Sequence, residues 1–498
     1  MSGPPSLPSP RPGRGWIAFG VLLLAYAPFA VLLDRYPLFY VDEGYYNFPA
    51  VSYLRGEGYC CLLTSDTPHG NLLWAINGPF FSRLQAVTFS LVGPSLGAAR
   101  LPEFTAAFLA IGLLCGVLAA RGLPVAGVAL AVLWTGDRSL LESMNGRPDG
   151  LSLLGLAIGF VFLLRTARTG AVAPAVGCGA GIGMACGFHF GSAYFVLATG
   201  LALVLLVPQG RRVRAVAAYA GGGLIAVGVI LIMWWPDIPE AVEQVLWHIG
   251  LSSPDDYCER LFRLVGVLRW SRYWAIALVA FWFVVGAVAV RRRIGSGTGD
   301  PVTQVLVATT LFGAAGLACV LSKRTLLPYY LIFFTPWAML GLVTWLGCGW
   351  KGGRRVIPIT VAVLAFTAWV PSLGWNLLRL REAVLSSGDL KREVRTDTLR
   401  RAIPPGATVS TTPELLIPAV EAGFRVVPLP FYPEPFRPAD DAFLVLDEAQ
   451  AHAPTHVHPD VLVGRRVVYR GGVYPGVLTC RIVIYSPVAP PVVIGSGR

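Results

Sequence analysis

Long apolar runs constrain the fold of this chain more than any other feature. Of its 498 residues, 55% are hydrophobic and only 14% are charged. Runs of this kind are typical of helices that cross a bilayer, and we count about eleven of them. The chain is therefore predicted to be a polytopic α-helical membrane protein. The predicted spans are Trp16–Leu33, Glu103–Ala120, Leu123–Trp134, Gly150–Leu164, Ala171–Gly187, Phe190–Val207, Ala215–Trp235, Trp274–Val290, Val302–Leu321, Leu326–Gly347 and Val356–Leu373.

Basic residues between these runs predict an orientation. If the N-terminus is cytoplasmic, every short inner loop is basic, as the positive-inside rule requires. This alternation depends on dividing residues 171–207 at His189, because one long span there would place the next arginines outside. We expect a multi-pass protein of the plasma (inner) membrane with its C-terminal segment outside. The inner basic residues are Arg121, Arg165, Arg168, Arg211, Arg212, Arg214, Arg291, Arg292, Arg293, Lys351, Arg354 and Arg355.

Composition divides the chain into three segments. Residues 1–15 are rich in Pro, Gly and Ser and predict a disordered cytoplasmic tail. No small-residue cleavage site follows the first run, so we interpret that run as a retained helix within a membrane domain over residues 16–375. Its first outer loop covers residues 34–95. From residue 376 to 498, charges return and short apolar runs predict a small extracytoplasmic α/β domain. Its expected elements are strands at Ala407–Thr411, Phe424–Pro428, Phe443–Leu446 and Val467–Tyr469, and a helix at Pro413–Ala422.

The remaining composition excludes some classes of function. The formal net charge is +12, which in a membrane protein serves topology and anionic lipid. No basic run interleaves with aromatic residues, so nucleic acid is excluded as a partner. The nine cysteines form no framework, and a pairing of Cys60 or Cys61 with Cys258 stays open. A surface loop is favoured over a metal site for three clustered histidines, His452, His456 and His458.

Two adjacent carboxylates, Asp42 and Glu43, follow the first apolar run. Tyr40, Tyr45 and Tyr46 flank them, and aromatic residues favour the membrane interface. Ionisable groups this close to a bilayer cost free energy, so they mark a functional site. The alternative interpretation is a solvated pair at a helix end.

Four further features lie in order along the chain and on one predicted face of the membrane. They are Asp42-Glu43-Gly44-Tyr45-Tyr46; Gly78–Phe81 with Gly93–Pro102; Arg147-Pro148-Asp149-Gly150; and Lys323-Arg324 with Pro328-Tyr329-Tyr330 and Pro336. Together these four stretches resemble motifs of the GT-C glycosyltransferases, in the branch of the protein O-mannosyltransferases and the lipid A aminoarabinose transferases. Their order and their common predicted face carry the resemblance, which covers residues 1–375. In the family, the third stretch is a second acidic motif that opens a helix, and the fourth is a basic, aromatic start to a late helix.

The resemblance implies a GT-C-like fold and an inverting glycosyltransferase activity. A hexosyl or pentosyl group would move from a polyprenyl-phosphate donor to a hydroxyl or amine of a glycan, lipid or protein at the outer face of the membrane. Such a transfer needs a carboxylate within about 3 Å of the acceptor proton. It also needs cations placed to meet the charge of the leaving phosphate. The expected partners are membrane lipid, the lipid-linked donor and the acceptor; no cofactor or metal site is firmly implied, and metal dependence stays open.

These requirements assign roles to residues of the matching stretches. Asp42 is expected to be the general base, and Glu43 to orient it or to bind sugar hydroxyls. Asp149 is expected to position the acceptor or the sugar, with a helix cap as the alternative. The expected substrate-binding residues are Arg147, Lys323, Arg324, Tyr330, Tyr45 and His69.

The sequence departs from the family pattern at Asn77, where the family has a lysine or a histidine. His69 or the Lys323-Arg324 pair are candidates to supply the missing cation. For that pair, the alternative is snorkelling at the interface. His189 lies in an apolar hairpin and is interpreted as a packed histidine rather than a ligand.

Two other classes compete with an enzyme. A transporter or flippase would also place charges near helix ends, but it usually has polar residues near mid-span and internal repeats. Here the predicted spans are nearly free of ionisable residues at their centres, and no repeat is found. A non-catalytic membrane scaffold would not need the Asp42-Glu43 pair or the Arg147–Gly150 motif.

Overall fold

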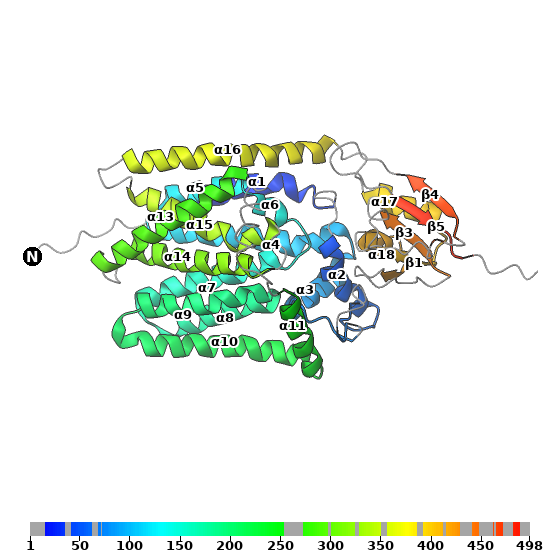
Figure 1. The fold of residues 1–498 in the computed structure, drawn as a ribbon, viewed down its shortest axis with the longest axis horizontal. Helices are drawn as coiled ribbons and strands as arrows, with labels where there is room; N and C mark the ends of the chain where they lie inside the picture. The colour runs from blue at the N-terminus through cyan, green and yellow to red at the C-terminus, as the bar shows by residue number, and fades with distance from the viewer. Residues whose placement is uncertain are drawn as a thin grey trace, which may run out of the picture.

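A helical bundle with a small β-sheet beyond one of its ends makes up the protein (Figure 1). This computed structural model describes residues 15–34, 41–61, 68–70, 72–252, 272–296, 300–323, 328–349, 356–385, 392–411, 415–428, 441–447, 462, 465–471 and 482–488. Several residues of the sequence-based predictions therefore lie outside the described residues: Tyr40, Cys258, Arg324, His452, His456 and His458.

Helices account for most of the described chain. The α-helices are α1 (Gly15–Ala30), α2 (Val41–Leu54), α3 (Pro79–Val92), α4 (Leu96–Ala120), α5 (Pro124–Thr135), α6 (Arg138–Glu142), α7 (Asp149–Thr169), α8 (Val172–Phe188), α9 (Tyr194–Leu206), α10 (Arg212–Trp234), α11 (Ile238–Ser252), α13 (Arg272–Ser296), α14 (Pro301–Leu321), α15 (Thr335–Gly349), α16 (Val356–Leu385), α17 (Arg392–Ala402) and α18 (Leu416–Glu421). The 3₁₀ helices are η2 (Phe190–Ala193), η3 (Gln209–Arg211) and η4 (Pro328–Phe333).

Six helices among the described residues are long and apolar enough to cross a membrane. They lie in α4, α7, α10 with η3, α13, α14 and α16. Shorter apolar helices occur at α1, α5, α8 and at η2 with α9. The prediction of a polytopic helical membrane protein is thus confirmed, whereas the number of about eleven spans stays a prediction. Helix α16 also continues to Leu385, past the predicted boundary at residue 376.

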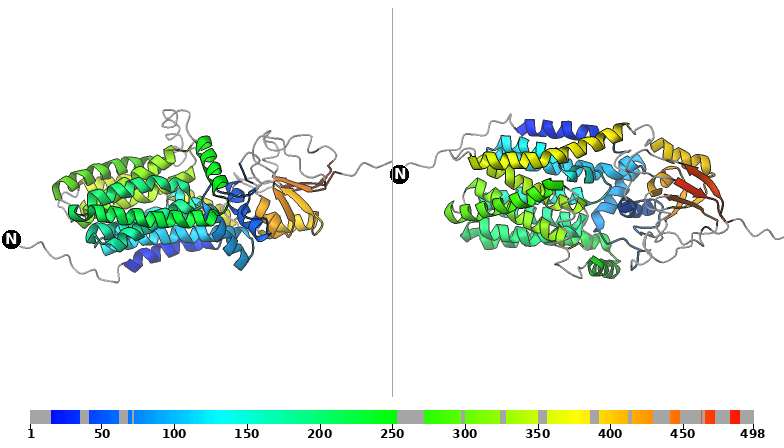
Figure 2. Two further views of the ribbon diagram at one scale, coloured as in Figure 1. Left: turned by 90° about the horizontal axis from the view of Figure 1, so that it is seen from below. Right: turned by 45° about the horizontal axis from the view of Figure 1, so that its top comes forward.

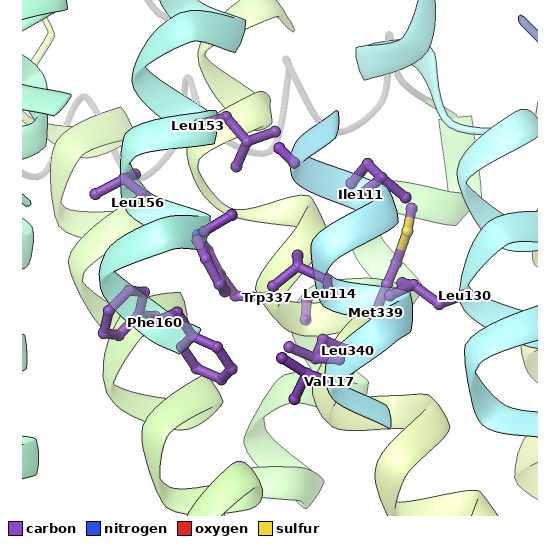
Figure 3. Close-up of a cluster of buried hydrophobic side chains, with 14 of the residues drawn as sticks. Ile111, Leu114, Val117, Leu130, Leu153, Leu156, Phe160, Trp337, Met339 and Leu340 are labelled. Carbon is purple, nitrogen blue, oxygen red and sulfur yellow. The ribbon is translucent and has the colours of Figure 1, made fainter. Parts of the chain in front are cut away.

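The bundle is held together by close helix contacts. Gly179 of α8 lies against the carbonyl of Tyr219, and Gly222 of α10 lies against the carbonyl of Val176, so a Cβ at either glycine would collide with backbone. Small residues allow helices to approach in this way, which is the usual basis of packing between membrane helices. Elsewhere α4, α7 and α15 share an apolar core around Phe160 and Trp337, whose ring centroids lie 5.3 Å apart (Figure 3).

A five-stranded sheet has the order β2-β1-β3-β5-β4. Strands β2, β1 and β3 are parallel, and β5 pairs antiparallel with both β3 and β4. The structure confirms the four predicted strands and the helix between the first two, and it adds β5, which the sequence analysis missed. The strands are β1 (Thr408–Thr411), β2 (Arg425–Pro428), β3 (Phe443–Asp447), β4 (Val467–Gly471) and β5 (Ile482–Tyr485).

Helices α2, α3 and α11 lie at the end of the bundle that faces the sheet, which we call the sheet end (Figures 1 and 2). Phe48 of α2 and Trp74 share an apolar cluster with Leu399 of α17 and Val409 of β1. Arg55 also donates to the carbonyl of Val426 at 3.2 Å. The segment that carries Asp42 and Glu43 is therefore packed between the bundle and the sheet.

Candidate active site

Glu43, in the first turn of α2, is fully buried in an ion pair. Its two carboxylate oxygens accept hydrogen bonds from Nε and Nη2 of Arg100 at 2.7 and 2.8 Å, and Arg100 is also fully buried. The backbone N–H of Gly146 donates to the same carboxylate at 2.6 Å. Glu43 is thus hydrogen-bonded both to α4 and to the turn before α7.

Neutral polar side chains fix this turn further. Nδ2 of Asn47 donates to the carbonyl of Gly146 at 2.9 Å, and Nε2 of Gln85 donates to Oδ1 of Asn47 at 2.8 Å. A Cβ at Gly146 would lie 2.9 Å from Asn47 Nδ2 and 3.0 Å from the carbonyl oxygen of Ala99. A larger residue would push Asn47 or Ala99 away, so glycine lets the turn that leads to the following residue pack closely against both.

That following residue, Arg147, bridges two carboxylates. Its Nη1 donates to Oδ2 of Asp42, and its Nε donates to Oδ2 of Asp149 at 2.8 Å. The side chain of Arg147 is buried and that of Asp149 is 5% exposed, whereas 26% of the Asp42 side chain is exposed. Asp42 is therefore the accessible carboxylate of the group.

Asp149 is the first residue of α7, as predicted, but it does not cap that helix. Glu103 of α4 accepts hydrogen bonds from the backbone N–H groups of Gly150 and Leu151, the latter at 3.0 Å. Because Glu103 satisfies these N–H groups, the Asp149 carboxylate is left to pair with Arg147. Glu103 was not among the predicted site residues, although an acidic residue at the start of an apolar run is a signal that could have identified it.

Aromatic rings connect Arg147 to a second cation. The guanidinium carbon of Arg147 lies 5.0 Å from the ring centroid of Tyr46 and 5.9 Å from that of Tyr330. Nζ of Lys323, just beyond α14, lies 5.2 Å from the same Tyr330 centroid. Two cations therefore share one aromatic ring, in contacts of the cation–π type.

His189, in the turn between α8 and η2, is placed beside Asp149. Its Nε2 lies 3.6 Å from Oδ1 of Asp149, and its Nδ1 accepts a hydrogen bond from the backbone N–H of Gly191 at 2.9 Å. Burial, together with the positive charges of Lys323 and Arg147, lowers the pKa of His189 well below its usual value. The ring is therefore neutral at physiological pH.

The structure brings together Asp42, Arg147, Asp149, Lys323 and Tyr330 from the sequence-predicted set. Three other candidates lie differently. Glu43 pairs with Arg100. His69 pairs with Glu243 of α11, its Nε2 lying 3.0 Å from the carboxylate. Tyr45 packs against the cluster shared with the sheet, and Arg324 lies outside the described residues. Across the part of the chain that the structure describes, no group of three or more His, Cys, Asp or Glu is arranged to hold a metal ion.

No protein-family model and no curated protein matches the sequence, but solved structures resemble its fold. ArnT from Cupriavidus metallidurans bound to undecaprenyl phosphate is 16% identical with a TM-score of 0.58, and the match covers 96% of this chain and 100% of that one. The apo state of the same protein is 14% identical with a TM-score of 0.60, over 97% and 100% of the two chains. The apo oligosaccharyltransferase of Archaeoglobus fulgidus is 14% identical with a TM-score of 0.50, over 94% and 74%. These proteins are GT-C superfamily members, so the chain has the GT-C fold that its sequence motifs predict.

Proposed function

We propose that this protein is an inverting glycosyltransferase that moves a hexosyl or pentosyl group from a polyprenyl-phosphate donor to a hydroxyl or amine acceptor. The observation that carries the proposal is the arrangement around Arg147 in a GT-C fold. A partly exposed carboxylate, Asp42, is held by Arg147, and a second cation, Lys323, lies across the ring of Tyr330. The proposed general base, Asp42, and a proposed stabiliser of the leaving phosphate, Lys323, thus belong to one connected group of contacts.

Asp42 is the general base in this proposal. An acceptor hydroxyl becomes a good nucleophile only when a nearby carboxylate takes its proton. Asp42 is the exposed member of the two carboxylates that Arg147 bridges, so an acceptor can reach it without displacing buried groups. The paired guanidinium fixes the direction of this carboxylate.

Lys323 and Arg147 would meet the charge that develops on the leaving phosphate. Cations already in place stabilise such a transition state without having to reorganise. Arg324 follows Lys323 directly in the sequence and remains a candidate for the same role. Tyr330 holds the two cationic side chains on one ring and would keep them near the same phosphate.

Glu43 and Asp149 support this group rather than react. Glu43 holds Arg100 and the N–H of Gly146, which sets the position of Arg147. Asp149 accepts a hydrogen bond from Nε of Arg147 and so orients the guanidinium toward Asp42. From the sequence, Glu43 was expected to orient Asp42 or to bind sugar hydroxyls, and Asp149 to position the acceptor or the sugar; here both act through Arg147 instead.

The lipid carrier is inferred from the fold and from its neighbour. The similar ArnT structure holds undecaprenyl phosphate, and the apolar helices of this chain fit a donor anchored in the bilayer. We place the protein in the plasma (inner) membrane, with the sheet end of the bundle on the extracytoplasmic face. A glycan, lipid or protein supplies the acceptor.

The test uses the purified full-length chain in lipid vesicles with a polyprenyl-phosphate donor carrying a radiolabelled sugar, plus an envelope extract as the acceptor. The proposal predicts that label moves covalently to the extract while free polyprenyl phosphate accumulates. A transporter or flippase would instead move intact donor between leaflets with no release of polyprenyl phosphate. That second result would overturn the proposal.

A further inference from the structure

The two oxygens of the buried Asp149 carboxylate differ in their surroundings. Oδ2 accepts the 2.8 Å hydrogen bond from Arg147, whereas Oδ1 has no hydrogen-bond partner among the described residues. A buried carboxylate oxygen without a donor is costly and rare in folded proteins. Nε2 of His189 lies 3.6 Å from this oxygen, and the His189 side chain, like that of Asp149, is only 5% exposed.

The tautomer of His189 is set by its other nitrogen. Because Nδ1 accepts the N–H of Gly191 at 2.9 Å, the proton of the neutral ring is on Nε2, which faces Asp149. A Cβ at residue 191 would come within 2.8 Å of Nδ1, so glycine is needed for this contact. The local sequence His189-Phe190-Gly191 thus aims an N–H at the carboxylate.

Neighbouring contacts hold together the two elements that carry His189 and Asp149. Ser152, one turn after Asp149 on α7, donates to the carbonyl of Ala185 at 2.9 Å, and its hydroxyl is also hydrogen-bonded to Ser192 of η2. The ring of His189 packs on Phe333 with centroids 5.2 Å apart. The backbones are therefore fixed, and a shift of about 0.7 Å in the side chains would complete a hydrogen bond. Such contacts are often long in a free enzyme and shorten in its complexes.

We propose that His189 is a positioning residue, whose Nε2–H donates to Oδ1 of Asp149 and so fixes the carboxylate that orients Arg147. The inference rests on the proposed function. It extends the group to a connected series, from His189 through Asp149 and Arg147 to the base Asp42. The competing interpretation, drawn from the sequence alone, is a histidine that serves only packing.

A pair of amide substitutions separates these two roles. In His189→Asn, the amide oxygen can still accept the N–H of Gly191, but the donor toward Asp149 is lost. In His189→Gln, the amide nitrogen reaches close to the position of Nε2 and keeps that donor. We expect His189→Asn to lower kcat about tenfold to hundredfold with little change in the KM for the donor, the loss typical of a displaced working group. His189→Gln should restore most of it. Equal losses in the two variants would overturn the positioning role.

A double-mutant cycle tests whether His189 acts through Asp149. Asp149→Asn removes the carboxylate, so adding His189→Asn to it should cost no further activity. If the two losses in kcat multiply instead, the histidine acts independently of Asp149 and the inference is wrong.

A spectroscopic readout keeps this inference separate from the proposed function. In ¹⁵N-histidine NMR of the full-length protein, His189, identified by its absence from His189→Gln, should show an Nε2–H tautomer. Its Nε2 signal should move in Asp149→Asn. An Nδ1–H tautomer, or an Nε2 signal that is unchanged in Asp149→Asn, would contradict the pairing even in an active enzyme. A wild type that shows both signatures but transfers no sugar would overturn the proposed function alone.

Discussion

Glu43 and Arg100 form a two-point ion pair across α2 and α4, with hydrogen bonds of 2.7 and 2.8 Å and no exposure of either side chain. The adjacent carboxylate, Asp42, is 26% exposed and pairs with Arg147 instead. Neighbouring acidic residues on one helical turn therefore have different surroundings. We infer that Glu43 holds the fold of the site and that Asp42 carries the chemistry.

Replacing Glu43 should mainly affect stability. Glu43→Gln leaves the charge of Arg100 buried without its partner, and breaking a buried ion pair in this way costs about 3–5 kcal/mol. Asp42→Asn is the matched control, because it changes a partly exposed carboxylate one residue away. Thermal unfolding in detergent should show a lower midpoint for Glu43→Gln and a nearly unchanged one for Asp42→Asn. Equal midpoints in the two variants would argue against the division of roles.

Lys323 should contribute to binding of the donor phosphate. Lys323→Gln removes a charge-assisted contact, which is worth about 1.5–3 kcal/mol, or roughly a tenfold to hundredfold weaker affinity. Lys323→Arg keeps the charge and should bind nearly as well as the wild type. The measurement is the equilibrium binding of polyprenyl phosphate to the purified protein. An unchanged affinity in Lys323→Gln would move the phosphate site away from Tyr330.

His248 of α11 should make stability depend on pH. Burial and then the positive charge of Lys323 lower its pKa to about 4, whereas an unfolded histidine has a pKa of about 6.5. Between these values the unfolded chain binds a proton that the folded chain does not. Stability should therefore fall as the pH decreases from about 6.5 to about 4.

The measurement is the midpoint of thermal unfolding across this pH range. His248→Gln should weaken the dependence, and His189 should supply part of what remains, because its pKa is lowered in the same direction. A variant whose midpoint follows the wild-type pH profile would show that His248 is not the titrating group.

The basic loops predict a membrane topology with the N-terminus in the cytoplasm and the chain after α16 outside. Reporter fusions within residues 386–391 should be active only with an extracytoplasmic reporter, and fusions beside Arg212 only with a cytoplasmic one. A cytoplasmic signal after α16 would put the sheet end of the bundle on the wrong side for the proposed reaction.

Much of the fold could be predicted because it follows from local composition. The apolar runs correspond to helices since a bilayer requires the backbone to bond within each segment. The run Ile482–Tyr485 carried the same kind of signal for a strand, with two β-branched isoleucines and a valine, and it was missed.

The contacts of the site could be predicted only in part. Asp42, Arg147 and Asp149 stand out because charged residues next to apolar runs are costly. Their partners depend on packing between segments far apart in the sequence, as for Glu43 and Arg100, 57 residues apart. His189 stands out locally only as an ionisable residue in an apolar hairpin, because its contact with Asp149 arises where α8 meets the start of α7.

The most direct test of the account is the turnover of Asp42→Asn, measured as transfer of labelled sugar from polyprenyl phosphate by purified protein in lipid. The substitution keeps the shape of the side chain and removes its basicity. We expect turnover to fall about 10²- to 10⁴-fold, the usual loss of a general base, while binding of polyprenyl phosphate and the unfolding midpoint stay near wild type. Near-full turnover in Asp42→Asn would contradict the assignment of the base and, with it, the proposed site.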